Sequence, residues 1–190
     1  GNKDIDIDMK LAEKIVVIAV KDLMNFMKSN YFEIIRGGLN STFQDNGREN
    51  LYHIGLPFSG AMDKRNYLIA NKLINNNEKD PVLEFAFQGP SLKYFGVTRD
   101  IVITGNVNFK IIKNDYTEHL GECYRTIKID DGDTIDIIST NKSVYGYLSV
   151  SGEFETELFG KSCSTNTKSI IGANKGKKLQ HDQIIKISKI

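Results

Sequence analysis

The sequence predicts a mainly β protein, a barrel or sandwich of short strands with one internal helix, preceded by an N-terminal amphipathic helix. Short strand-like apolar runs recur from residue 32 onward, and glycine- and asparagine-rich turns separate them. Helical spacing of apolar residues occurs near the N-terminus and again after residue 61. A doubly wound fold would need helices that alternate with the strands, and this alternation is missing from the pattern.

The first thirty residues differ in pattern from the rest of the chain. Apolar residues recur there at steps of three and four, Asp8 is a candidate N-cap, and Ser29 with Asn30 would end the helix. We interpret residues 1–30 as a helical segment or linker that docks on the body or on a neighbouring chain, and residues 31–190 as one domain. The apolar stripe of this predicted helix consists of Ala12, Ile15, Val16, Ala19, Leu23, Phe26 and Met27.

The remaining elements follow in chain order. A helix is predicted over residues 62–74, after a long glycine-, asparagine- and aspartate-rich connection that ends near residue 60. The run Asp130-Asp131-Gly132-Asp133 predicts a β-hairpin turn, because glycine supplies a positive φ. The predicted strands are residues 32–35, 82–87, 91–95, 101–104, 107–113, 124–129, 134–139, 144–150 and 183–187.

Composition narrows the range of partners. The 190 residues include 25 Lys and Arg against 24 Asp and Glu, which gives a net charge of +1 and no electrostatic footprint for nucleic acid or an anionic membrane. The longest apolar run, residues 15–20, is far shorter than the roughly 20 residues of a membrane helix. Two cysteines make no disulfide framework, and the three histidines are scattered. We therefore expect a cytoplasmic protein that binds neither nucleic acid nor membrane and holds no metal ion.

The segment of residues 36–63 concentrates the chemically useful side chains among several glycines. Guanidinium groups suit carboxylate or phosphate, and aspartates suit proton transfer or a metal-bound phosphate. The same residues also fit a purely structural interpretation, in which residues 45–47 form a turn and Ser59 or Asp63 caps the following helix. The physical pattern leaves both interpretations open. The side chains concerned are Arg36, Gln44, Asp45, Arg48, His53, Ser59 and Asp63.

Four short motifs in this half of the chain resemble a known family. They are Q-D-x-G-R at 44–48, G-L-P-x-S-G-A-M-D at 55–63, L-E at 83–84 and G-P-x-L at 89–92. Together they resemble the family of the 5-oxoprolinase C subunit and the biotin-dependent carboxyltransferases, which includes allophanate hydrolase subunit 2-like proteins and the carboxyltransferase region of urea carboxylase. The resemblance spans roughly residues 32–187 and implies a cyclophilin-like β-barrel.

The resemblance also implies a function and roles for residues. It implies a subunit of an ATP-dependent complex that opens 5-oxoproline to glutamate, with companion subunits, a small lactam or amide substrate, and ATP with magnesium used by the complex as a whole. Carried over by position, the candidate catalytic residues are Asp45, Asp63 and His53. The candidate substrate- or anion-binding residues are Arg48, Arg36, Gln44, Ser59 and Gly60.

This chain departs from the family pattern in two respects. Cys163 stands where the family has an arginine, and family chains continue into a second lobe, so this chain corresponds to a first lobe that we expect to be inactive alone. Two alternatives therefore remain open. One is carboxyl transfer from carboxybiotin to urea or another amide, with biotin as the cofactor. The other is a non-catalytic regulatory module that binds a partner resembling a kinase inhibitor.

Overall fold

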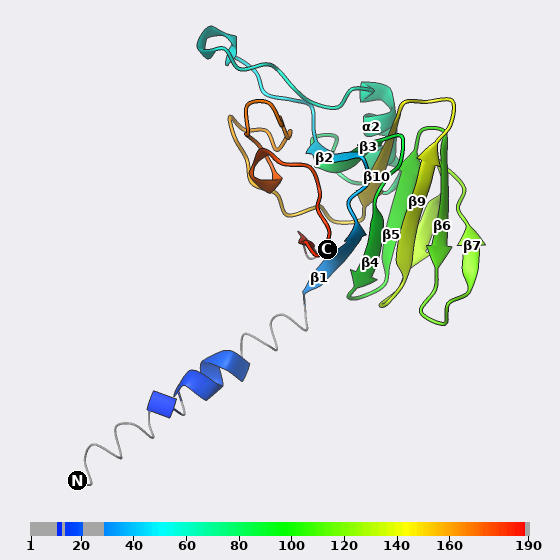
Figure 1. Ribbon diagram of the computed structural model, residues 1–190. Coiled ribbons are helices and arrows are strands. Elements are labelled where there is room, and N and C mark those ends of the chain that lie inside the picture. The colour runs from blue at the N-terminus through cyan, green and yellow to red at the C-terminus, as the bar shows by residue number, and fades with distance from the viewer. Residues whose placement is uncertain (1–10, 13, 21–28, 189–190) are drawn as a thin grey trace, which may run out of the picture.

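Two antiparallel β-sheets form the body of the protein in a computed structural model that describes residues 11–12, 14–20 and 29–188 (Figure 1). One sheet has the strand order β11 (Ile184–Ile187), β1 (Asn30–Arg36), β4 (Ser91–Phe95), β9 (Thr134–Thr140), β6 (Val107–Ile112) and β7 (Glu118–Leu120). The other has the order β2 (Asn40–Gln44), β3 (Val82–Ala86), β10 (Tyr145–Val150), β5 (Arg99–Thr104) and β8 (Thr126–Ile129).

The main hydrophobic core lies between the two sheets. Phe32 and Leu92 from the first sheet and Phe85 and Leu148 from the second belong to one buried cluster. Along β1 the burial alternates, as expected for a strand with one face in the core. These observations confirm the predicted mainly β class, whereas closure of the sheets into a barrel stays a prediction.

Helix α2 (Lys64–Leu73) covers the outer face of the second sheet. Tyr67 and Ala70 of the helix pack with Val82 and Val102 in a second buried cluster. Strand β3 is consequently buried along its whole length, because the core lies on one face and the helix on the other. The helix predicted over residues 62–74 is confirmed, with its ends one or two residues inside the predicted bounds.

Three features of the fold differ from the sequence prediction. Strand β2 lies inside the connection predicted to lack structure, because its buried residues are mostly polar and leave no apolar alternation to recognise. Strand β7 is three residues long and fully exposed, so it carries no burial pattern. The predicted hairpin at residues 130–133 is wrong. The chain does turn there, but β8 and β9 enter different sheets and pair with other strands.

The N-terminal segment is described only in part. Residues 11–12 and 14–20 are helical, and the Ile15 and Val16 side chains are exposed. The predicted cap at Asp8 and the second half of the apolar stripe lie outside the described residues. The amphipathic helix over residues 1–30 and the domain boundary at its end therefore stay predictions. In the described part of the chain, no helix combines the length and the apolar character needed to cross a membrane.

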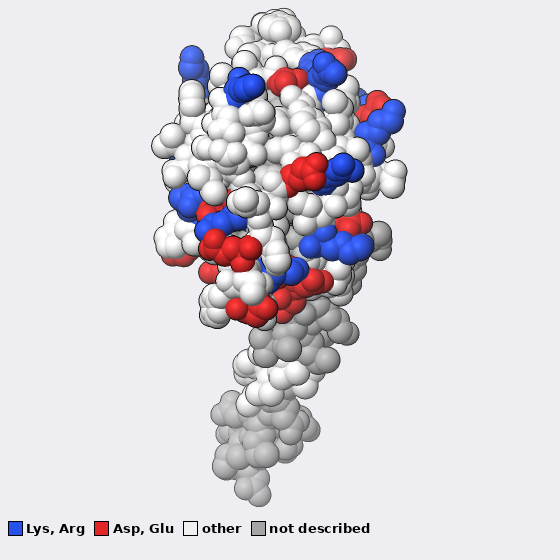
Figure 2. Space-filling model, turned by 90° about the vertical axis from the view of Figure 1, so that its right-hand side faces the viewer, with Lys and Arg blue, Asp and Glu red and all other residues white. Residues whose placement is uncertain are grey.

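Charges of both signs are interspersed on the face shown in Figure 2, which is the side of the molecule that carries β6 and β7 in Figure 1. Ion pairs on these strands and their connections join Lys110 to Glu118 at 2.7 Å and Lys113 to Asp133 at 2.6 Å. This face therefore presents no continuous field of a single sign to a charged partner.

Candidate functional site

The Asp45 carboxylate lies at the centre of a buried network. It accepts hydrogen bonds from the Ser162 and Ser164 hydroxyls at 2.6 Å each and from the Gly47 and Cys163 amides at 2.8 and 2.7 Å. Burial alone would raise the pKa of Asp45, but these hydrogen bonds outweigh it and hold the pKa below the usual value. The carboxylate is therefore ionised and fully engaged, which suits an anchor better than a proton acceptor.

The Arg48 guanidinium completes this network from the other end of the Q-D-x-G-R motif. Its side chain is only 1% exposed. It donates hydrogen bonds to the Ser59 hydroxyl at 3.1 Å, to the Phe159 carbonyl at 3.3 Å and to the Ser164 carbonyl. Burial lowers the pKa of Arg48 and the nearby Asp45 charge opposes that shift, yet a guanidinium remains charged. We call the buried pair Asp45 and Arg48, with the segment of residues 159–165 that it holds, the Asp45–Arg48 clamp.

Gln44 extends the clamp from strand β2. Its side-chain amide donates to the Thr42 hydroxyl at 2.9 Å and to the Thr165 carbonyl at 3.1 Å. Its side-chain oxygen is buried and finds no hydrogen-bond partner among the residues that the structure describes. The motif at residues 44–48 therefore forms several hydrogen bonds with the segment 159–165, although more than a hundred residues separate the two in sequence.

The backbone at Ser59 and Gly60 packs closely on the turn that follows Asp45. Both have positive φ, 57° at Ser59 and 93° at Gly60. A Cβ atom on Gly60 would lie 2.9 Å from the Gly47 amide nitrogen. The next amide, that of Ala61, donates to the Asp45 carbonyl at 2.9 Å. Glycine is thus required at position 60 both for its φ and for this close approach.

Replacement of Gly60 by alanine is expected to destabilise the protein by about 1–2 kcal/mol, because alanine is strained at this φ and its methyl group would displace the turn at Gly47. The midpoint of urea unfolding measures the loss. Gly55→Ala is the matched control, since it has a similar φ of 79° but no atom within 4 Å of the added Cβ. Equal losses in the two variants would contradict the close-approach argument.

A second buried group fixes the start of helix α2, where the S-G-A-M-D motif ends. The Glu84 carboxylate accepts the Met62 amide and the Tyr147 hydroxyl, each at 2.8 Å, and the Tyr147 oxygen accepts the Asp63 amide at 2.7 Å. Burial raises the pKa of Glu84. The Asp63 carboxylate caps the helix by accepting the Asn66 amide at 3.1 Å. The structural interpretation of Asp63 as a cap is therefore confirmed.

A cleft of about 720 Å³ opens above the Asp45–Arg48 clamp, and Asp45 and Gly47 lie in its wall. Three exposed lysines from separate parts of the chain line it, namely Lys64, Lys79 and Lys161. Lys64 is the first residue of α2, and its ammonium group lies 4.8 Å from the centre of the Phe58 ring. Such a cleft offers positive charge to an anionic ligand.

An adjoining slot of about 460 Å³ contains the predicted residue His53. It is lined by Glu49, Asn50, Tyr52, His53 and Phe58, and it shares Glu49, Asn50 and Phe58 with the lysine-lined cleft. The slot belongs to an arm, residues 49–57, whose short 3-10 helix η1 (Tyr52–Ile54) projects from the body in Figure 1. His53 is exposed and lines the slot, whereas the buried Asp45 lines the cleft.

Arg36 lies elsewhere in the fold. Its guanidinium forms a 2.8 Å ion pair with Asp136 on β9 and donates to the Ile137 carbonyl at 3.0 Å. The structure therefore brings Gln44, Asp45, Arg48, Ser59 and Gly60 together and leaves Arg36 outside that group. The catalytic and binding roles assigned to all eight residues stay predictions.

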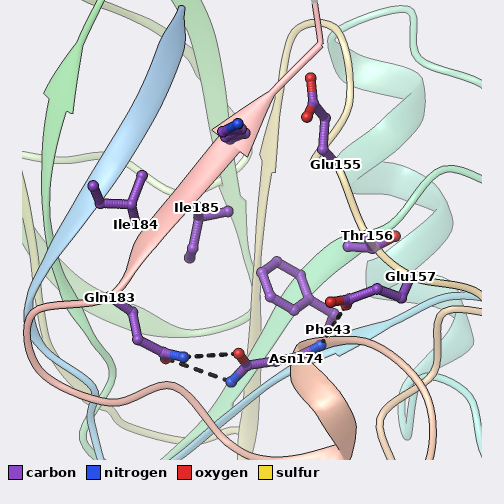
Figure 3. A pocket seen from close by; sticks show the side chains of 9 residues that line it. Phe43, Glu155, Thr156, Glu157, Asn174, Gln183, Ile184 and Ile185 are labelled. Carbon is purple, nitrogen blue, oxygen red and sulfur yellow. Dashed lines mark hydrogen bonds between the residues drawn. The ribbon is translucent and has the colours of Figure 1, made fainter. Parts of the chain in front are cut away.

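A third pocket, of about 210 Å³, lies beside β11 (Figure 3). Asn174, in the short 3-10 helix η2 (Asn174–Gly176), and Gln183 point toward each other in its lining, and the Gln183 side-chain amide donates to the Asn174 side-chain oxygen at 2.8 Å. The Glu157 carboxylate accepts a hydrogen bond from the Asn174 backbone amide at 3.0 Å. These polar groups satisfy one another, so this pocket offers a ligand less than the lysine-lined cleft does.

Sequence reasoning missed two parts of the site. The three cleft lysines carry no local motif, since they come from helix α2, the connection before β3 and the segment after β10. Tyr147 has no local signal either, because it lies in an ordinary apolar strand pattern and only the fold brings its hydroxyl to Glu84. Among the described residues, no three histidine, cysteine, aspartate or glutamate side chains gather as potential metal ligands.

The family can be assigned from comparison with known proteins. A family model described as the carboxyltransferase domain, subdomain A and B, matches residues 54–190, which is more than half of the chain. The chain belongs to this family. The match confirms the resemblance that the motifs indicated, and it includes helix α2, the cleft lysines and the segment 159–165 of the Asp45–Arg48 clamp.

Members of the carboxyltransferase-domain family that resemble this chain are parts of enzymes. The chain is 25% identical to urea amidolyase of Saccharomyces cerevisiae over 154 residues, which cover 80% of the chain and 8% of that protein. It is 30% identical to the 5-oxoprolinase C subunit of Haemophilus influenzae over 140 residues, which cover 74% of the chain and 44% of that protein. The chain thus spans less than half the length of either relative.

Solved structures support the same family at the level of fold. The crystal structure of the Kluyveromyces lactis urea carboxylase resembles this chain with a TM-score of 0.78 and 26% identity, over 85% of this chain and 14% of that one. The crystal structure of TTHA0988 gives a TM-score of 0.72 at 24% identity, over 84% of this chain and 57% of that one. The fold of this chain is therefore similar to that of the carboxyltransferase domain of urea carboxylase.

Proposed function

We propose that this chain is a cytoplasmic subunit of an ATP-dependent 5-oxoprolinase-type complex that opens a small lactam, 5-oxoproline, to glutamate with the help of companion subunits. The observation that carries the proposal is the Asp45–Arg48 clamp, which joins the family motif at residues 44–48 to the segment 159–165 beneath a lysine-lined cleft. The identity of 30% to the 5-oxoprolinase C subunit of Haemophilus influenzae supports it.

The arrangement suits the chemistry of lactam opening. ATP with magnesium would supply the phosphoryl group that makes the lactam carbonyl carbon electrophilic. The cleft lysines would stabilise the negative charge of the substrate carboxylate and of the phosphorylated oxygen. Asp63 would hold or move a proton, since its half-buried carboxylate precedes the cleft residue Lys64 and accepts two hydrogen bonds, both from Asn66, whereas Asp45 accepts four in the clamp.

Turnover of 5-oxoproline with ATP, measured after mixing this chain with candidate companion subunits, tests the proposal. The Asp63→Asn variant is expected to fall by about a hundredfold in turnover, because it loses a proton-transfer group. It should fold normally, since asparagine caps a helix as well as aspartate does. Unchanged turnover would contradict the role of Asp63. Tight binding of partners without any turnover would favour the regulatory module instead.

Carboxyl transfer from carboxybiotin to urea or another amide is the second candidate. The observation that favours it is the similarity to the Kluyveromyces lactis urea carboxylase, with a TM-score of 0.78. The same lysines would then face the carboxylate of carboxybiotin. An assay with a biotinylated carrier, bicarbonate, ATP and urea separates the two candidates, because 5-oxoprolinase turnover needs neither biotin nor bicarbonate.

A further inference from the structure

We propose that the lysine-lined cleft and the adjoining aromatic slot form one binding site for a nucleotide on this chain, with the phosphates in the cleft and the base in the slot. The inference deepens the proposed function and rests on it for its biological setting. It concerns residues of this chain alone, and it can be tested without companion subunits.

The charges around the cleft favour a ligand with several negative charges. Lys64, Lys79 and Lys161 face the cleft from separate segments, so they can surround a ligand from different sides. The Asp45 carboxylate also lines the cleft, but four hydrogen bonds and the neighbouring Arg48 already balance its charge. Glu49 is the remaining carboxylate in the lining. Three ammonium groups carry more positive charge than a ligand with one carboxylate would balance, and this charge suits a chain of phosphates.

A neighbouring depression limits where the phosphates can lie. It has a volume of about 420 Å³ and shares Lys79 and Lys161 with the cleft, but Glu153 and Glu155 also line it. Two carboxylates would repel an anion placed there. We therefore place the phosphates in the cleft itself, between Lys64 and the other two lysines. There Glu49 is the carboxylate without a compensating charge, whereas the depression has both Glu153 and Glu155.

The slot supplies a surface for a planar ring. Tyr52 is 69% exposed, and Phe58 is half-buried between the slot and the cleft. Bases stack on aromatic side chains with a gain of about 1–3 kcal/mol each. Because the slot and the cleft share Glu49, Asn50 and Phe58, one ligand with a ring at one end and phosphates at the other would occupy both. A nucleotide has this shape and charge.

Calorimetric titration of the chain with ATP, inorganic tripolyphosphate and adenosine tests the assignment. We expect ATP to bind, and its affinity to fall about tenfold in Lys79→Gln and in Lys161→Gln, which is about 1.4 kcal/mol for each lost charge. Tyr52→Ala should weaken ATP and leave tripolyphosphate unchanged. Lys142→Gln is the matched control, because Lys142 is an exposed lysine in the turn between β9 and β10, outside the linings of the cleft and the slot.

Three outcomes would overturn the nucleotide site. They are no binding of ATP, equal affinity of the Lys79, Lys161 and Lys142 variants for ATP, and tripolyphosphate binding as tight as ATP with no effect of Tyr52→Ala. The third would leave a plain anion site. Failure here is distinguishable from failure of the proposed function, since a complex that turns over 5-oxoproline while this chain binds no ATP would overturn only the nucleotide site.

Discussion

Replacing Asp45 with alanine is expected to destabilise the protein by about 3–5 kcal/mol, because four hydrogen-bond donors lose a buried carboxylate and the nearby Arg48 charge is no longer balanced. The Arg48 guanidinium, 1% exposed, would lose its compensating charge. The Ser162 and Ser164 hydroxyls would lose their acceptor in the same step. Urea unfolding followed by circular dichroism measures the loss. The control Glu122→Ala removes an exposed carboxylate and should change stability by less than about 0.5 kcal/mol.

The dependence on pH and on Arg48 gives two further checks of the same prediction. Because the folded protein holds the pKa of Asp45 below its usual value, the stability that this group contributes is present above about pH 4 and is lost as the pH falls through the folded value. The difference between the wild type and Asp45→Ala should therefore shrink in acid. The double variant Asp45→Ala with Arg48→Met should lose less than the sum of the single variants, because the two groups share one network. Strict additivity would contradict the clamp.

Most of the fold could be predicted because strands with one buried face carry their own alternation. Strand β4 begins and ends at the predicted residues, since its apolar residues and the preceding Gly89-Pro90 mark it locally. Strand β2 could not be predicted, because Ser41, Thr42 and Gln44 are polar yet buried, and Gln44 reaches the Thr165 carbonyl only in the folded chain. The turn at Gly132 is present as predicted, but a local motif does not say which strand each flanking segment will pair with.

The candidate site also has a part that the sequence predicts and a part that only the fold reveals. The motif at residues 44–48 identified Gln44, Asp45 and Arg48, and the structure brings all three to the segment 159–165. Their side chains, however, are occupied by that segment, which the sequence could not reveal because the contact spans more than a hundred residues. Lysines far apart in sequence meet at the cleft only through the packing of α2 and the loops around it. The motif therefore predicted the residues of the Asp45–Arg48 clamp but not the lysines that line the cleft.

Replacing Glu84 with methionine is expected to destabilise the protein by about 2–3 kcal/mol, although methionine has a similar volume. Two buried donors, the Met62 amide and the Tyr147 hydroxyl, would lose their acceptor, at about 1–3 kcal/mol each. Removing a buried carboxylate returns part of this cost, because burial already disfavours its charge. The midpoint of urea unfolding at neutral pH measures the net effect.

The matched variant Glu84→Gln separates the hydrogen bonds from the charge. Its side-chain oxygen can still accept the Met62 amide, so its loss at neutral pH should be well below that of Glu84→Met. Because burial raises the pKa of Glu84, the wild type should lose stability as the pH rises from about 4.3 through the raised folded value, and Glu84→Gln should lack this loss. This trend is opposite in sign to that of Asp45. If Glu84→Met and Glu84→Gln were equally stable, the anchoring of helix α2 would depend on packing and its own cap, and Glu84 would not hold the S-G-A-M-D segment in place.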